Sequence, residues 1–166
     1  EASSVLVADL AANHVFHARE PDATHPLGSL LFPLVAVVAS EHLSMESTLA
    51  AAPDPAGLLG AGETYELYEL LFPLLMTGNE GALETIAARL GRERLTRLVA
   101  QKARSLGMVD TQINSLAVDD ARNVTSAEDV FQLAKYVNSY RSFVLSMGSG
   151  ELVESVYGGH PFPALD

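Results

Sequence analysis

The sequence contains no cysteine, so disulfide bonds and thiolate metal sites are excluded. It has few basic residues: ten lysines and arginines stand against 21 aspartates and glutamates, giving a net charge of -11. Nucleic acid and anionic membrane surfaces would be repelled on average, so neither is an expected partner. The start of the sequence lacks the basic region of a signal peptide.

Long apolar runs are also missing. The longest, residues 27–39, is interrupted by Gly28, Ser29 and Pro33 and is too short to cross a bilayer, so we expect no transmembrane segment and interpret the run as a buried helix. With 166 residues, 48% of them hydrophobic and 19% charged, the chain is predicted to fold as one domain over residues 1–166.

The local patterns predict a β-hairpin followed by many helices. Residues 4–8 and a strand starting at Val15 flank a turn at 9–13, and a loop over 21–26 precedes the apolar helix at 29–42. After a loop at 50–62, Thr64 is predicted to cap the next helix, and Thr125 to begin a capping box. Further helices are expected at 80–90, 92–106, after residue 126, and at 140–147.

No motif calls for a metal or a cofactor, and we expect neither. His14 and His17 are three residues apart on a predicted strand, which sends them to opposite faces. His160 stands in a tail rich in glycine and proline without an evident acidic partner. His25 lies four residues before Ser29, so it is kept as an alternative base, although a capping or surface role is the simpler interpretation.

Several short segments together resemble one family. They are Pro26-Leu27-Gly28-Ser29, Gly62-Glu63-Thr64-Tyr65, Thr77-Gly78-Asn79, Lys102-Ala103 with Leu106-Gly107-Met108 and Asp110-Thr111, and Asn123 with residues 125–129. In this order and spacing they resemble the serine D-alanyl-D-alanine carboxypeptidases, the low-molecular-mass penicillin-binding proteins of peptidase family S11, related to class A β-lactamases. Each segment is weak alone.

The resemblance implies a helix-rich α+β fold of the β-lactamase and D,D-peptidase type. It would comprise an N-terminal hairpin and a helical region, with the C-terminal strands of that fold missing from this chain. It also implies an extracytoplasmic location in a bacterium and a serine that attacks the D-Ala-D-Ala bond of peptidoglycan stem peptides. The family's third motif, Lys-Thr-Gly, does not occur in these residues.

The resemblance places the nucleophile at Ser29 and the base of the Ser-x-x-Lys motif at Phe32. Serine needs a neighbouring base to take its proton, and a phenyl ring accepts none. Losing a positioned base typically costs about 10²–10⁴-fold in rate. Pro33 removes the N–H that would bond the carbonyl of Ser29, so a distorted helix start is expected unless Pro33 falls in the first turn.

The second motif of the family, Ser-x-Asn, falls on Thr77-Gly78-Asn79. Thr77 retains a hydroxyl and Asn79 the amide that, by the resemblance, helps to hold substrate. We therefore predict a catalytically inactive, degenerate member with a vestigial site at Ser29, Thr77 and Asn79, which binds a peptidoglycan stem peptide or an envelope protein. The alternatives are a working peptidase that uses Ser29 with an unconventional base, and an interaction module whose cleft is filled by Phe32.

Overall fold

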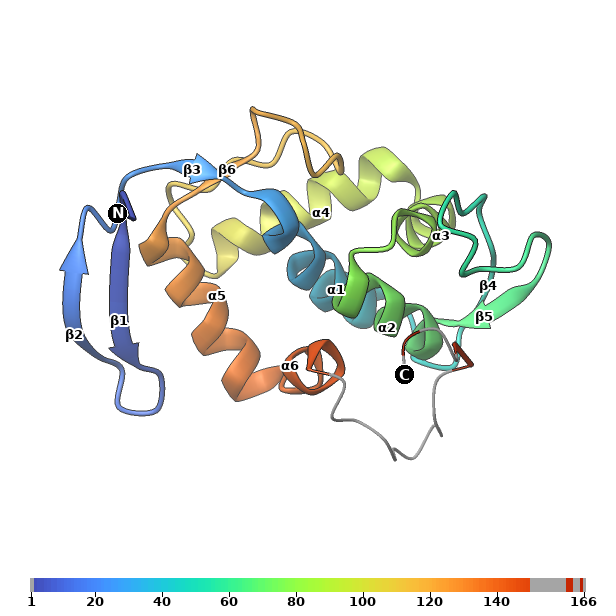
Figure 1. Cartoon of the computed structure of the whole chain (residues 1–166), viewed down its shortest axis with the longest axis horizontal. Helices are drawn as coiled ribbons and strands as arrows, with labels where there is room; N and C mark the ends of the chain where they lie inside the picture. The colour runs from blue at the N-terminus through green and yellow to red at the C-terminus, as the bar shows by residue number, and fades with distance from the viewer. Residues whose placement is uncertain (1, 150–160, 163–164, 166) are drawn as a thin grey trace.

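The structure is a computed structural model that describes residues 2–149, 161–162 and 165 (Figure 1). Among these, six short strands precede or separate the helices. The strands are β1 (Val5–Asp9), β2 (His14–Arg19), β3 (His25–Pro26), β4 (Thr48–Ala50), β5 (Thr64–Glu66) and β6 (Val124–Thr125). The helices are the 3₁₀ turn η1 (Gly28–Leu30), α1 (Leu31–His42), α2 (Leu67–Thr77), α3 (Glu80–Leu90), α4 (Arg92–Ser105), α5 (Ala127–Tyr140) and α6 (Phe143–Gly148).

The predicted hairpin is confirmed. Strands β1 and β2 pair antiparallel, with an irregularity between Val7 and Ala8. The side chain of Asp9 holds the turn, because its Oδ1 accepts the N–H groups of Ala11 and Ala12 at 2.8 and 2.9 Å. The hairpin lies at one side of the molecule, with β1 beside α5 (Figure 1).

Helix α1 forms the centre of the core, as its uniformly apolar sequence predicts. It packs against α2, α3, α4 and α6, and its residues from Leu34 to Ala39 are all buried. Leu30 is its N-cap, so Pro33 lies in the first turn, and Ser29 belongs to the preceding 3₁₀ turn. In a helix that started at Ser29, the Ser29 carbonyl would accept the N–H of residue 33, which a proline lacks. The α-helical hydrogen bonds therefore begin one residue later, at the carbonyl of Leu30.

Two helix starts differ from the prediction. Thr64 is not a cap: it belongs to β5, which pairs with β4, and α2 begins after Glu66. Glu66 and Glu69 exchange hydrogen bonds in a reciprocal capping box, with the Glu66 N–H donating to Glu69 Oε2 at 2.8 Å. This arrangement satisfies the donors that Thr64 was expected to satisfy.

The capping residue of α5 is Ser126, not Thr125. Its hydroxyl oxygen accepts the N–H of Asp129 at 3.2 Å, while Thr125 lies in β6 opposite His25. The remaining helices agree with the sequence pattern: Leu95, Val99 and Ala103 of α4 are buried, and the last predicted helix appears as α6. Within the described part of the chain, no helix is long and apolar enough to cross a membrane.

A polar network joins α1, α4 and α5 beside the core. Lys102 Nζ donates to Glu41 Oε1 at 2.5 Å and to the Tyr136 hydroxyl at 3.1 Å, and Tyr136 donates to the same Glu41 oxygen at 2.7 Å. Arg141 adds a contact to Glu41 at 3.3 Å. Burial alone would raise the pKa of Glu41, but the hydrogen bonds and positive charges outweigh it and lower the pKa below 4.5.

This network predicts a pH-dependent contribution to stability. Because the folded-state pKa of Glu41 is lowered, its contribution is present above about pH 4.5 and is lost as the pH falls through the folded value. We expect Glu41→Gln to lower the free energy of unfolding by about 1 kcal/mol at pH 7 and by progressively less as the pH falls below 4.5. Urea unfolding over a series of pH values from 7 downward measures this. The control is Glu93→Gln, whose exposed partner Arg97 is 4.0 Å away; an equal loss in both variants would contradict the prediction.

Candidate active-site cleft

A cleft of about 520 Å³ lies where η1, the start of α1, the end of α2 and the start of α3 meet. Three of the predicted site residues, Ser29, Phe32 and Thr77, line it together. The other described residues of its wall are Leu30, Pro33, Leu75, Met76, Gly78, Glu80 and Val118. The sequence prediction that the first two motifs form one site is thus consistent with the structure.

Ser29 is held in place by the backbone on its N-terminal side. Strand β3 pairs with β6, and the N–H of Leu27 donates to the carbonyl of Asn123 at 2.9 Å. The Ser29 side chain is exposed at the edge of the cleft, and its hydroxyl makes no hydrogen bond to any described residue. The hydroxyl of the predicted nucleophile is therefore accessible, and none of the described residues that could act as a base is hydrogen-bonded to it.

Phe32 occupies the position of the family's lysine and packs against Gly78. The ring is 6% exposed, and a Cβ atom built on Gly78 would lie 2.6 Å from its Cε2 atom. Gly78 also has a φ of +65°, which favours glycine. The ring thus fills the space beneath the second motif with apolar carbon, and residue 78 must have no side chain for it to do so.

The Thr77 hydroxyl donates to the carbonyl of Pro73 at 2.8 Å. That carbonyl also accepts the N–H groups of Gly78 and Asn79 as α2 ends. Since the Thr77 proton is used inside the helix end, the hydroxyl oxygen presents lone pairs to the cleft rather than a donor.

Asn79 is not among the residues that line the cleft. It is buried and forms the N-cap of α3, with Oδ1 accepting the N–H of Ala82 at 2.7 Å. Its Nδ2 donates to both carboxylate oxygens of Asp54, at 3.1 and 3.3 Å. Both ends of the Asn79 amide are therefore used to join α3 to the loop after β4. The amide has no group left for the substrate contact that the sequence predicted. An asparagine directly before a predicted helix is a cap signal that the sequence contained.

Asp54 is the centre of that loop. Its carboxylate accepts the N–H groups of Ala56, Leu58 and Leu59 besides the amide of Asn79. Burial opposes ionisation, but these hydrogen bonds outweigh it and lower the pKa of Asp54 below 3.8.

His25, the alternative base, lines a different hollow, of about 440 Å³, between the hairpin and α5. Its Nε2 is buried and has no hydrogen-bond partner. The structure does not bring it into the Ser29 cleft, whereas it does place Glu80 there. Glu80 is the first residue of α3, and no motif in the sequence indicated its role. His160 lies outside the described residues.

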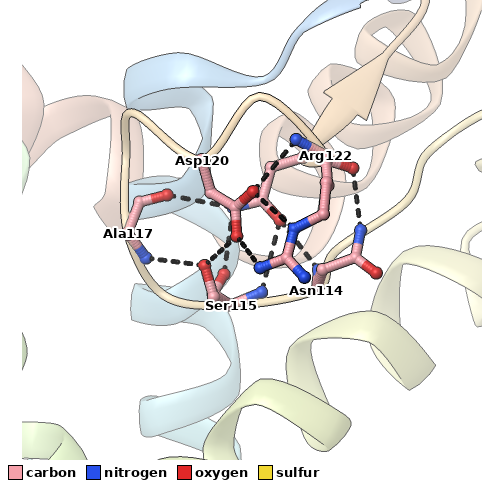
Figure 2. Close-up of polar contacts among 6 residues, drawn as sticks. Asn114, Ser115, Ala117, Asp120 and Arg122 are labelled. Atoms are coloured by element: carbon pink, nitrogen blue, oxygen red, sulfur yellow. Dashed lines mark hydrogen bonds and ion pairs between the residues drawn. The ribbon is translucent and has the colours of Figure 1, made fainter.

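The loop before β6 forms one wall of the cleft through Val118 and is held by its own polar contacts. Asp120 binds Arg122 through both carboxylate oxygens and accepts the Ser115 hydroxyl at 2.7 Å (Figure 2). The Arg122 hydrogen bonds lower the pKa of Asp120 far below 3.8. Buried Asn123 accepts the N–H of Asn114 at 2.7 Å.

A second group of resemblance residues anchors this loop to α5. Asp129 Oδ2 accepts the N–H of Asp110 at 2.8 Å and the Thr111 hydroxyl at 2.7 Å, and Thr111 also contacts the Thr125 hydroxyl. These residues hold the loop that forms one wall of the cleft, and none of them lines the cleft itself. Among the described residues, no cluster of three or more histidines and carboxylates could hold a metal ion.

The architecture and motifs agree with known proteins. No family model matches the sequence. The chain is 31% identical over 117 residues to D-alanyl-D-alanine carboxypeptidase DacB2 of Mycobacterium tuberculosis, across 66% of this chain and 40% of that protein. The chain is thus similar to the D-alanyl-D-alanine carboxypeptidases, and this similarity confirms the family resemblance that the sequence motifs indicated.

Solved structures confirm the expected fold class. A penicillin-binding protein homologue of M. tuberculosis has a TM-score of 0.75 at 25% identity, over 86% of this chain and 58% of its own. Penicillin-binding protein D2 of Listeria monocytogenes, with cefotaxime bound, has a TM-score of 0.78 at 22% identity, over 95% and 70%. The carboxypeptidase-like chain spans two fifths of the curated relative's length.

The cap formed by Asn79 gives a stability prediction. We expect Asn79→Ala to lower the free energy of unfolding by about 1–3 kcal/mol, because it removes the α3 cap and the amide that donates to Asp54. Thermal unfolding measures this. Ser142→Ala is the matched control, since Ser142 is the N-cap residue of α6 but makes no capping hydrogen bond. Equal losses in the two variants would contradict the role of Asn79.

The contact between Phe32 and Gly78 predicts an energetic coupling. Gly78→Ala is expected to be destabilising for two reasons, the left-handed backbone and the clash with the ring, but Phe32→Ala removes the second. A double-mutant cycle measured by urea unfolding should give a coupling of about 0.5–3 kcal/mol. Strict additivity would show that the ring does not limit residue 78.

Proposed function

We propose that this protein is a non-catalytic D,D-carboxypeptidase-like domain, comprising residues 1–166, that binds peptidoglycan stem peptides in the cleft of Ser29 and Thr77. The similarity to D-alanyl-D-alanine carboxypeptidases supports the choice of ligand, and it also supports an extracytoplasmic location in a bacterium. An envelope protein is the alternative partner for the same surface. In this proposal the chain is a degenerate member of its family.

The observation that carries the proposal is the environment of Ser29. The position that would supply its base holds the Phe32 ring, buried against Gly78, and no described group is hydrogen-bonded to the Ser29 hydroxyl. A serine that keeps its proton is a poor nucleophile at neutral pH. Rotating Phe32 away would not supply a base, because the ring has no atom that takes up a proton.

Binding a peptide requires an open cleft with polar and apolar walls but no base, and this cleft has such walls. It is open at about 520 Å³ despite Phe32, which argues against a pure interaction module with a filled cleft. Its walls combine apolar side chains with the Ser29 hydroxyl, the Thr77 oxygen and the Glu80 carboxylate. Pockets of this size and mixed lining are typical of small-ligand sites.

One observation favours the second candidate function, a working serine D,D-carboxypeptidase or endopeptidase. Glu80 lines the cleft together with Ser29, and a carboxylate is a possible unconventional base. In this alternative Ser29 would attack the D-Ala-D-Ala carbonyl and pass its proton to Glu80. The D-Ala-D-Ala peptide bond would break, the leaving D-alanine amine would take the proton from Glu80, and water would then cleave the acyl-enzyme on Ser29.

Labelling with a fluorescent penicillin separates the two functions. We expect no covalent adduct on Ser29, because acylation requires the same deprotonation as the peptidase reaction. M. tuberculosis DacB2 is the comparison protein, and intact-mass spectrometry after incubation reports the adduct. An adduct that is absent in Ser29→Ala would overturn the non-catalytic proposal, and its further loss in Glu80→Gln would identify the base.

A further inference from the structure

Glu80 is the one charged side chain among the described residues that line the Ser29 cleft. The remaining walls contribute two hydroxyl groups, from Ser29 and Thr77, and apolar side chains. No described lysine, arginine or histidine lies in that lining. The charge inside the cleft is therefore negative, in a chain whose net charge is already -11.

Three possible sources of positive charge around the cleft are already compensated. Arg92, which lines an adjoining hollow with Glu80 and Val118, pairs with Glu84. Arg122, on the loop that supplies Val118, is bound to both oxygens of Asp120 (Figure 2). The positive end of α3 also lies at the cleft, but Asn79 caps its Ala82 N–H and Glu80 adds a negative charge in the same turn. None of the three leaves an uncompensated cation for a ligand carboxylate.

The hydrogen-bonding side chains of the cleft also favour a cation, because they offer more acceptors than donors. The Glu80 carboxylate accepts only, and the Thr77 hydroxyl has donated its proton to the Pro73 carbonyl, so its oxygen also accepts. Ser29 contributes a hydroxyl that can do either. An ammonium group, with three donors and no acceptor, complements such a set, whereas a carboxylate needs several donors and these side chains offer only the Ser29 hydroxyl.

We propose that the cleft recognises an ammonium group on an aliphatic chain and disfavours a terminal carboxylate. Leu75, Met76 and Val118 provide the apolar wall against which the methylene carbons of such a chain would pack. This inference rests on the proposed stem-peptide function and makes it more specific. The group recognised is the free side-chain amine of a lysine-type residue, not the D-alanine carboxylate.

Three synthetic peptides test the selectivity by isothermal titration calorimetry. They are Nα-acetyl-L-Lys-D-Ala-D-Ala, its C-terminal amide, and the Nα,Nε-diacetyl form. We expect the amide to bind about two- to fivefold tighter than the acid, and acetylation of the side-chain amine to weaken binding by about the same factor, as for an exposed ion pair. Tighter binding of the acid, or indifference to acetylation, would overturn the inference.

A matched pair of variants tests whether Glu80 is responsible. Glu80→Gln should abolish the preference for the free amine, while Glu93→Gln should keep it. Both variants change the net charge by one unit, but Glu93 lies in the first turn of α4 and is not among the residues that line the cleft. Equal weakening in the two variants would show that only the overall charge of the protein attracts the ligand.

A diamine without peptide character, cadaverine, separates the inference from the proposed function. Glu80-dependent binding of cadaverine without binding of any peptide would support ammonium recognition and contradict the stem-peptide function. Peptide binding with a preference for the carboxylate would do the opposite. No saturable binding of either kind of probe would overturn both.

Discussion

The packing of Phe32 against Gly78 is the constraint on which the cleft depends. It places a ring where the family's chemistry requires an amine, and it requires a glycine in left-handed conformation at the middle of the second motif. The two motifs are thus joined by apolar contact, where a hydrogen-bonded relay would otherwise connect them. A core contact of this kind stabilises the geometry of the site, and the phenyl ring itself cannot take up a proton.

The buried polar residues that resemble the family's motifs hold the loops around the cleft in place and do not line it. Asn79 and Asp54 join α3 to the loop after β4, and Asn123 and Asp129 fold the loop that carries Val118. Buried amides and carboxylates of this kind are costly unless hydrogen-bonded, so each one specifies a single loop conformation. A scaffold held in this way can keep the shape of a peptide-binding cleft after its chemistry is lost.

The sequence predicted the hairpin and the helices, because periodicity is a local property. Of the predicted site residues Ser29, Phe32, Thr77 and Asn79, the first three line one cleft and Asn79 does not. The sequence prediction failed where two local signals competed. Thr64 and Thr125 satisfy the pattern of a cap, but each is drawn into a short strand pair and the next capping residue takes its place. The role of Glu80 was missed because only the folded chain brings the start of α3 to the Ser29 turn.

Replacing the lysine of the catalytic motif changes more than the supply of a base. A lysine at position 32 would also place a positive charge beside Ser29 and Thr77, where it would favour a carboxylate ligand. With phenylalanine there, Glu80 alone sets the sign of the local field among the described residues of the cleft. In the two proposals made here, the substitution that withholds a base from the serine also withholds a counter-charge from the ligand carboxylate, so the proposed loss of catalysis and the proposed ligand preference have one physical cause.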